Sequence, residues 1–221
     1  MCRFVLITAP TACDMRPLLQ QFATMCAQSH GLDGSGWQGD GWGLAWKDAA
    51  GHWQVQRSVA PIWTEPDRLA ALPRTRHLLA HARSASFAQH VGDLAYCQPY
   101  VHGPYAFVFN GFLQGVRLPR RVPGSLGTEK IWALVQAQLA LGEAPQQALA
   151  SVYALLERHS RRIQACNLGL SDGQRYAFYN GNPQGEPYYQ LHQAQQEALH
   201  LVCSEPFGTL QWQRYAGSPP T

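Results

Sequence analysis

The feature that most constrains the fold is a pair of amphipathic helices in the middle of the chain, enclosed by strand-like segments on both sides. Apolar residues recur every three or four positions over Thr128–Leu141 and Pro145–His159, which is typical of helices with one buried face. Short apolar runs predict strands at Cys2–Ala9, Gly43–Lys47, Trp53–Ser58, Leu78–Ser84, Tyr105–Asn110, Ile163–Ser171, Arg175–Tyr179, Leu199–Ser204 and Gln211–Tyr215. Strands at both ends around central helices suit a layered α+β domain.

Another helix is expected over Asp14–Ser29, with Asp14 as its N-cap and Pro17 in its first turn. A glycine-rich loop follows from Gly31 to Gly43, and Ser171-Asp172-Gly173 predicts a hairpin turn. The 221 residues, of which 46% are hydrophobic, supply enough apolar material for one domain over residues 2–216. We expect residues 217–221 to form a flexible tail.

Charge and cysteine usage narrow the function classes. The net charge is only +3 and the basic residues are scattered, which argues against nucleic acid as a partner. The sequence has no signal-like start and no run long enough for a membrane helix, and its six cysteines include no CxxC pair. These features favour a cytoplasmic protein with reduced thiols and no membrane partner.

No metal or cofactor is expected. His77 and His81 are four residues apart and would share one face of a strand, with Cys97 and His102 further along the chain. Core histidines are a more common explanation of such a pattern than metal ligands.

A cysteine at position 2 is the first sign of chemistry. Removal of Met1, which aminopeptidases perform before small residues, would leave a chain beginning with Cys2. The thiol and the free α-amino group then belong to one residue. An α-amino group titrates near pH 8 in model peptides, so it can take the thiol proton at about neutral pH. Position alone is weak support, because many proteins carry a cysteine there by chance.

Four further motifs follow in order: Asp40-Gly41-Trp42-Gly43, His81-Ala82-Arg83-Ser84-Ala85-Ser86, Phe109-Asn110-Gly111-Phe112 and Cys203-Ser204-Glu205-Pro206. The second and third are each expected at a strand end. With the opening Met-Cys-Arg, this set resembles the class II glutamine amidotransferase family. The similarity is greatest to its short, stand-alone members, including those that hydrolyse γ-glutamyl amides in ergothioneine biosynthesis. The resemblance spans residues 2 to 206 and implies the four-layer αββα sandwich of N-terminal-nucleophile hydrolases.

The resemblance also implies residue roles. Cys2 would attack the amide carbon, and the side chain of Asn110 with the backbone N–H of Gly111 would form the oxyanion hole. Arg83, with Ser84 beside it, would bind the substrate carboxylate.

The backbone around Asp40, Gly41 and Trp42 would shape the floor of the site. Structural alternatives stay open for three of these positions. Arg83 would also suit a surface ion pair, Asn110-Gly111 an ordinary turn, and Asp40 a purely structural role.

The chain departs from the family pattern at Gly127. The family has an aspartate there that holds the α-ammonium of glutamine, whereas this sequence reads Ser125-Leu126-Gly127-Thr128-Glu129. Glycine cannot pair with an ammonium, so we expect free glutamine to be a poor substrate, with Gly127, Thr128 and Glu129 still at the substrate. Glu129 either meets the substrate amine or stabilises the helix N-terminus.

Three functions compete. The favoured one is a cysteine amidohydrolase that cleaves a γ-glutamyl-type or related small-molecule amide through a Cys2 thioester. The second is a glutaminase subunit that delivers ammonia to a partner synthetase. The third is a catalytically silent binding domain on the same scaffold, which retention of Met1 would support.

Overall fold

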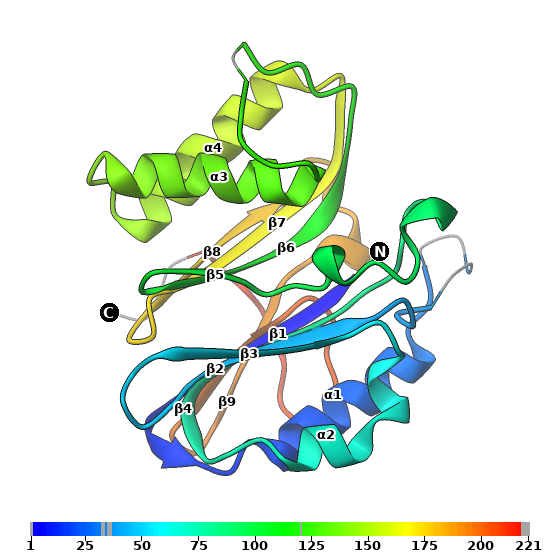
Figure 1. Ribbon diagram of the computed structural model, residues 1–221, viewed down its shortest axis with the longest axis vertical. Coiled ribbons are helices and arrows are strands. Elements are labelled where there is room, and N and C mark those ends of the chain that lie inside the picture. The colour runs from blue at the N-terminus through cyan, green and yellow to red at the C-terminus, as the bar shows by residue number, and fades with distance from the viewer. Residues whose placement is uncertain (1, 32–33, 35–36, 120, 218–221) are drawn as a thin grey trace.

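The protein is a stack of four layers, in which two β-sheets lie face to face and helices cover their outer sides (Figure 1). The computed structural model describes the chain except for residues 1, 32–33, 35–36, 120 and 218–221. Most of the predicted tail 217–221 and part of the loop from Gly31 to Gly43 therefore lie outside the described residues. The predicted α+β class and αββα layering are confirmed.

The larger sheet has seven strands in the order β11-β9-β10-β1-β4-β2-β3, and every neighbouring pair is antiparallel. Along β1, Phe4 and Leu6 face the second sheet, whereas Val5 and Ile7 face the helices. The strands are β1 (Arg3–Cys13), β2 (Trp42–Lys47), β3 (Trp53–Ser58), β4 (Thr75–Ala82), β9 (His192–Gln196), β10 (Leu199–Cys203) and β11 (Gln213–Arg214).

The smaller sheet has four antiparallel strands: β5 (Tyr100–His102), β6 (Tyr105–Gln114), β7 (Arg162–Ser171) and β8 (Tyr176–Gly181). Helices α3 (Gly127–Ala140) and α4 (Pro145–His159) cover its outer face. Their apolar stripes pack on the sheet, with the ring of Trp132 stacked on Phe107 at 5.0 Å between ring centroids. The amphipathic pattern of the two central helices is thus explained by one buried face each.

Helices α1 (Arg16–Gln28) and α2 (Pro66–Ala70) cover the larger sheet. The prediction of Asp14 as N-cap is wrong, since Met15 occupies that position. The Asp14 carboxylate instead accepts the Arg16 N–H and pairs with its guanidinium. Short 3₁₀ turns lie at Ile62–Thr64, Ala88–His90, Leu94–Tyr96 and Pro187–Tyr189.

Several strand boundaries differ from the prediction. Strand β1 continues past Pro10 to Cys13 through an irregularity after Thr8. Strand β6 continues to Gln114, so the expected strand end at Asn110-Gly111 is wrong, and so is the alternative of a turn there. Strands β5 and β9 were not predicted.

Candidate active site

The two ends of the sequence meet at the start of β1. Ser204 accepts the Phe4 N–H at 2.9 Å, and the buried Arg3 guanidinium forms an ion pair with Glu205. The same guanidinium lies over the Tyr188 ring, 4.2 Å from its centroid. The late Ser-Glu-Pro motif therefore fixes the strand that begins directly after Cys2.

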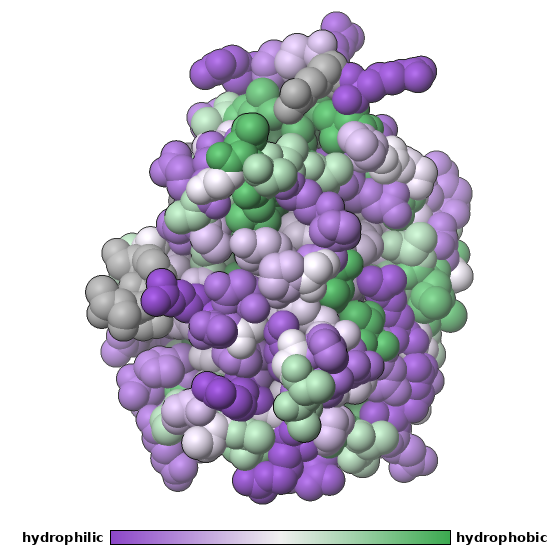
Figure 2. Space-filling view, turned by 60° about the vertical axis from the view of Figure 1, so that its left-hand side comes forward, coloured by the Kyte–Doolittle hydropathy of each residue, from purple (hydrophilic) through white to green (hydrophobic). Residues whose placement is uncertain are grey.

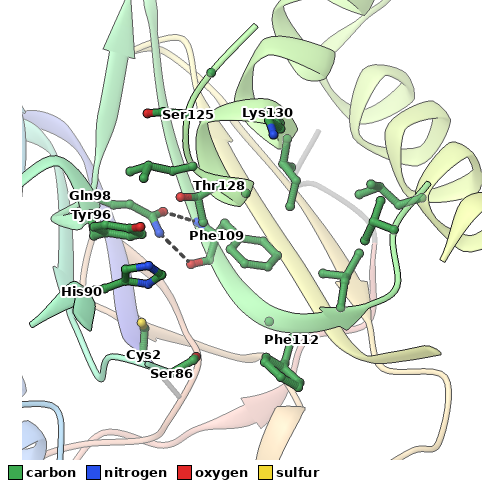
Figure 3. Close-up of a pocket in the computed structure, with 18 of the residues that line it drawn as sticks. Cys2, Ser86, His90, Tyr96, Gln98, Phe109, Phe112, Ser125, Thr128 and Lys130 are labelled. Carbon is green, nitrogen blue, oxygen red and sulfur yellow. Dashed lines mark hydrogen bonds between the residues drawn. The ribbon is translucent and has the colours of Figure 1, made fainter. Parts of the chain in front are cut away.

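Cys2 is half-buried and directly precedes this strand. Its thiol donates a weak hydrogen bond to the Ser84 carbonyl, with 3.7 Å between sulfur and oxygen. Figure 3 shows Cys2 at one side of a cavity, close to Ser86 and His90. Because neighbouring side chains alternate along a strand, Cys2 shares with Phe4 the face that points toward the second sheet.

The cavity has a volume of about 920 Å³ and opens between the two sheets and the start of α3. It brings together some but not all of the residues predicted for the site. Its wall contains Cys2, Arg83, Ser84, Gly111, Gly127 and Thr128. Its described wall does not contain Asn110, Asp40, Gly41, Trp42 or Glu129.

Asn110 lies within β6, and its side chain is only 1% exposed. It shares a face with Ala106 and Val108, which pack against the larger sheet, so its amide points into the space between the sheets. Neither atom of this amide has a hydrogen-bond partner among the described residues. An unpaired buried amide costs about 1–3 kcal/mol, and such groups call for an explanation.

Gly111 follows Asn110 in β6 and pairs with Cys166 of β7. A Cβ at Gly111 would collide with the Ala165 carbonyl oxygen, so only glycine fits. The next residue, Phe112, lies on the cavity wall beside Cys2 (Figure 3). An unpaired amide and a backbone at the cavity wall suit the predicted oxyanion hole, whose assignment stays a prediction.

Arg83 is 3% exposed and forms no ion pair with any described residue, so the alternative of a surface ion pair is wrong. Its guanidinium donates to the carbonyl oxygens of Asp40 at 3.2 Å, Asp93 at 3.4 Å and His90 at 2.5 Å. It also stacks on the Tyr96 ring at 4.7 Å. Arg83 therefore holds the segment 84–97 against the site, and its role in binding a carboxylate stays a prediction.

The loop before β2 supports the same wall. The Asp40 carboxylate accepts the Ala85 N–H at 2.6 Å, in line with a structural role. Gly41 has a φ of +119°, a conformation that favours glycine. Trp42 faces away from the cavity into the core under the helices, where its indole donates to Glu65 at 2.9 Å.

The first turn of α3 begins at Gly127, where an added Cβ would have no atom within 4 Å. Thr128 Oγ1 lies 3.1 Å from the Tyr100 hydroxyl. The Glu129 carboxylate accepts the N–H groups of Ser125 at 2.9 Å and Leu126 at 3.2 Å. Glu129 therefore caps the helix, which supports the structural interpretation of this residue.

Sequence reasoning assigns Gln98 no role in the site. Its side-chain amide accepts the Phe109 N–H at 2.6 Å and donates to the Phe109 carbonyl at 3.2 Å (Figure 3). Gln98 thereby ties the segment after Arg83 to β6, one residue before Asn110. No local pattern indicates this role, because the glutamine pairs with the backbone of a separate strand. His90 and Tyr96, stacked at 4.6 Å, also line the cavity unpredicted.

The described residues contain no group of three or more His, Cys, Asp or Glu side chains placed to hold a metal ion. Burial lowers the pKa of His77 to about 4 and that of His81 to about 3, so both are neutral at pH 7. No helix within the described part of the chain is long and apolar enough to cross a membrane.

Comparison with solved structures gives three informative matches. A glutamine aminotransferase class-II domain protein from Silicibacter pomeroyi matches with a TM-score of 0.61 and 18% identity, over 99% of this chain and 100% of that one. A predicted glutamine amidotransferase from Pseudomonas aeruginosa matches with 0.53 and 14%, over 100% of both chains. The glutamine phosphoribosylpyrophosphate amidotransferase of B. subtilis matches with 0.56 and 14%, over 92% of this chain and 42% of that one.

No family model and no curated protein matches the sequence. The structural matches show that this chain shares its fold with class II glutamine amidotransferase domains.

Proposed function

We propose that the protein is an amide-bond hydrolase in which Cys2, exposed as the N-terminal residue by removal of Met1, is the nucleophile. One observation carries the proposal. The half-buried Cys2 thiol lies at a cavity that Gly111 also lines, and the adjacent Asn110 amide has no hydrogen-bond partner among the described residues. A nucleophile close to an amide donor that has no other partner is an arrangement that suits acyl transfer.

The proposed steps balance as follows. The α-amino group takes the thiol proton, and the thiolate attacks the amide carbon. Asn110 Nδ2–H and the Gly111 N–H hold the oxyanion. The C–N bond then breaks and the α-ammonium returns the proton to the leaving amine. A water molecule attacks the thioester, giving up a proton through the α-amino group to the departing thiolate, and the acid leaves.

Free glutamine is a poor substrate in this proposal. Its α-ammonium needs a carboxylate, and the described cavity wall contains no Asp or Glu side chain. Gly127 stands at the position where the resemblance implies an aspartate, and Glu129 is engaged by the helix N-terminus. Lys130 and Arg121 on the same wall add positive charge. A γ-glutamyl-type amide would have to carry its amine blocked or absent.

An ammonia donor for a partner synthetase is the second candidate. Phe87, Val91 and Leu94 are exposed on the segment that Arg83 holds at the cavity, which would suit a protein partner there. Efficient turnover of glutamine with release of ammonia would favour this candidate over a hydrolase for other amides.

Intact-mass spectrometry tests the proposal. We expect the purified protein to lack Met1 and to gain one adduct from a chloromethyl ketone, mapped to Cys2. Cys2→Ser should lose the adduct. Cys13→Ser is the matched control, since Cys13 is the other half-buried cysteine, and it should keep the adduct. Retention of Met1, or labelling that persists in Cys2→Ser, would contradict the proposal.

A further inference from the structure

We infer that the acyl group cleaved at Cys2 is apolar and carries no ammonium, and that it lies in an extension of the cavity between β6, α3 and α4. This inference rests on the proposed function and names the substrate class of that site. The extension, here called the apolar arm, is lined by Leu113, Leu118, Val122, Ile131, Leu134 and Leu156.

The apolar arm is continuous with the nucleophile. A single cavity contains both Cys2 and Leu156, which belongs to α4 on the outer side of the smaller sheet. In Figure 3 the rings of Phe112 and Phe109 lie between Cys2 and the helices, so one side of the cavity is apolar from the thiol to the arm, whereas Gln98 and Thr128 lie on another side. An acyl chain attached to Cys2 would contact carbon atoms along the side that the two rings form.

The volume of the cavity favours a substrate larger than glutamine. A volume of about 920 Å³ lies at the upper end of the range of about 300–1,000 Å³ that accommodates drug-sized ligands. Gly127 contributes to this room, since no atom lies within 4 Å of the Cβ position there. The site thus lacks both the small size and the anionic group that an amino-acid amide would need.

Charge excludes a cationic acyl group. The charged side chains that line the described cavity are Arg83, Arg121 and Lys130, with no carboxylate among them. An ammonium in the arm would lose its hydration and gain only repulsion. A neutral chain avoids both costs.

The depth of the arm assigns it to the acyl group and not to the leaving amine. Leu134 and Leu156 in the arm are each 2% exposed, whereas Ser86, which lies close to Cys2 in Figure 3, is exposed. An amine held in the deep end would have to pass the thioester to leave. With the acyl chain there, the amine departs and water enters from the exposed end.

The experiment combines turnover and binding with one ligand series. The wild-type protein is given butanamide, hexanamide, octanamide, 6-aminohexanamide and glutamine, and ammonia release is measured. The Cys2→Ala variant is titrated calorimetrically with the same ligands, so that binding is measured without reaction. We expect affinity and kcat/KM to rise on the order of threefold per added methylene. The terminal ammonium of 6-aminohexanamide would be an unpaired buried charge in the arm. It should therefore lower the affinity and kcat/KM by at least about tenfold.

A pair of variants tests where the acyl chain of the substrate lies. Val116→Asp places a carboxylate on the cavity wall at a residue that is 40% exposed, so the fold should tolerate it. It should lower kcat/KM for hexanamide on the order of tenfold and reduce the discrimination against 6-aminohexanamide. Leu141→Asp, at a 78% exposed position outside the wall, is the control and should change neither.

Each outcome decides the inference. Affinity that does not depend on chain length overturns it, and so does chain-dependent binding without turnover. Turnover of glutamine or 6-aminohexanamide as fast as hexanamide also overturns it, while the Cys2 hydrolase stands. Absence of any adduct on Cys2 would instead overturn the proposed function, and the inference with it.

Discussion

At the residue scale, we expect opposite effects on stability and activity from substituting Asn110 and Asn167, its neighbour on β7. The Asn110 amide has no hydrogen-bond partner among the described residues, so Asn110→Ala should leave the melting temperature nearly unchanged. Loss of an oxyanion donor should lower kcat/KM by about 10²–10³-fold toward the best amide of a substrate series. Thermal unfolding and steady-state kinetics on the same samples measure both effects.

Asn167 faces Asn110 in the β6–β7 register and is the matched control. Its amide donates to the Tyr189 carbonyl at 2.8 Å and accepts from Asn180 at 2.7 Å. Asn167→Ala should therefore cost about 1–3 kcal/mol of folding free energy while the folded fraction stays active. A stability loss in Asn110→Ala with activity intact would assign Asn110 a structural role.

Sequence motifs at the residue scale pick out Cys2, Arg83 and Gly111, which line one cavity, and their roles there stay predictions. The sequence misplaces Trp42, because nothing near it indicates which face of the sheet its side chain occupies. It gives Gln98 no role, because no local pattern indicates that this side chain binds the backbone of β6.

At the element scale, the start of α3 depends on Glu129. Its carboxylate accepts two otherwise unpaired backbone N–H groups, at Ser125 and Leu126. Glu129→Ala should cost about 1 kcal/mol, and Glu129→Gln, which keeps an acceptor, should cost less. Urea unfolding followed by circular dichroism measures the difference. Glu157→Ala, an exposed carboxylate on α4, should lie within about 0.5 kcal/mol of wild type.

The same variants separate the two interpretations of Glu129. A capping residue changes stability and leaves the KM for an amine-bearing substrate unchanged. A rise in that KM at unchanged stability would instead mean that the carboxylate meets the substrate.

At the element scale, the sequence predicts a helix or strand correctly where a single periodicity of apolar residues dominates the segment. The central helices were found within a residue or two because their apolar stripes are strong. Strand β6 was cut short at Asn110-Gly111, because these residues favour turns locally and the pairing with β7 overrides that preference. Strand β9, with the sequence HQAQQ, has one buried apolar residue, Ala194, and is defined by its partner β10.

At the scale of the whole molecule, packing of the two sheets buries polar side chains such as His81 between them. This burial can be seen only in the tertiary structure. His81 lies in β4 on the same face as Leu79, which packs against the smaller sheet. Neither ring nitrogen of His81 has a hydrogen-bond partner in the described part of the chain. The sequence marked His81 as a core residue and gave no sign of the acid sensitivity that such burial creates.

The depressed pKa of His81, about 3 because of burial and then of Arg83, makes folding depend on pH. The unfolded chain takes up this proton near pH 6.5, whereas the folded chain does not until about pH 3. The unfolded state therefore binds more protons between these values, and stability falls as the pH is lowered through that window. Between pH 7 and pH 5, His81 should account for about 2 kcal/mol of the loss, and His77, whose pKa is about 4, adds to it.

Urea unfolding of wild type and His81→Gln at pH 7 and pH 5 measures this contribution. The variant need not be as stable as wild type at pH 7, because only the change between the two pH values matters. That change should shrink by about 2 kcal/mol in His81→Gln and stay the same in His102→Gln, which alters an exposed histidine. An equal loss in wild type and His81→Gln would mean that His81 is protonated or hydrated in the folded protein, and that the layer between the sheets admits water next to Cys2.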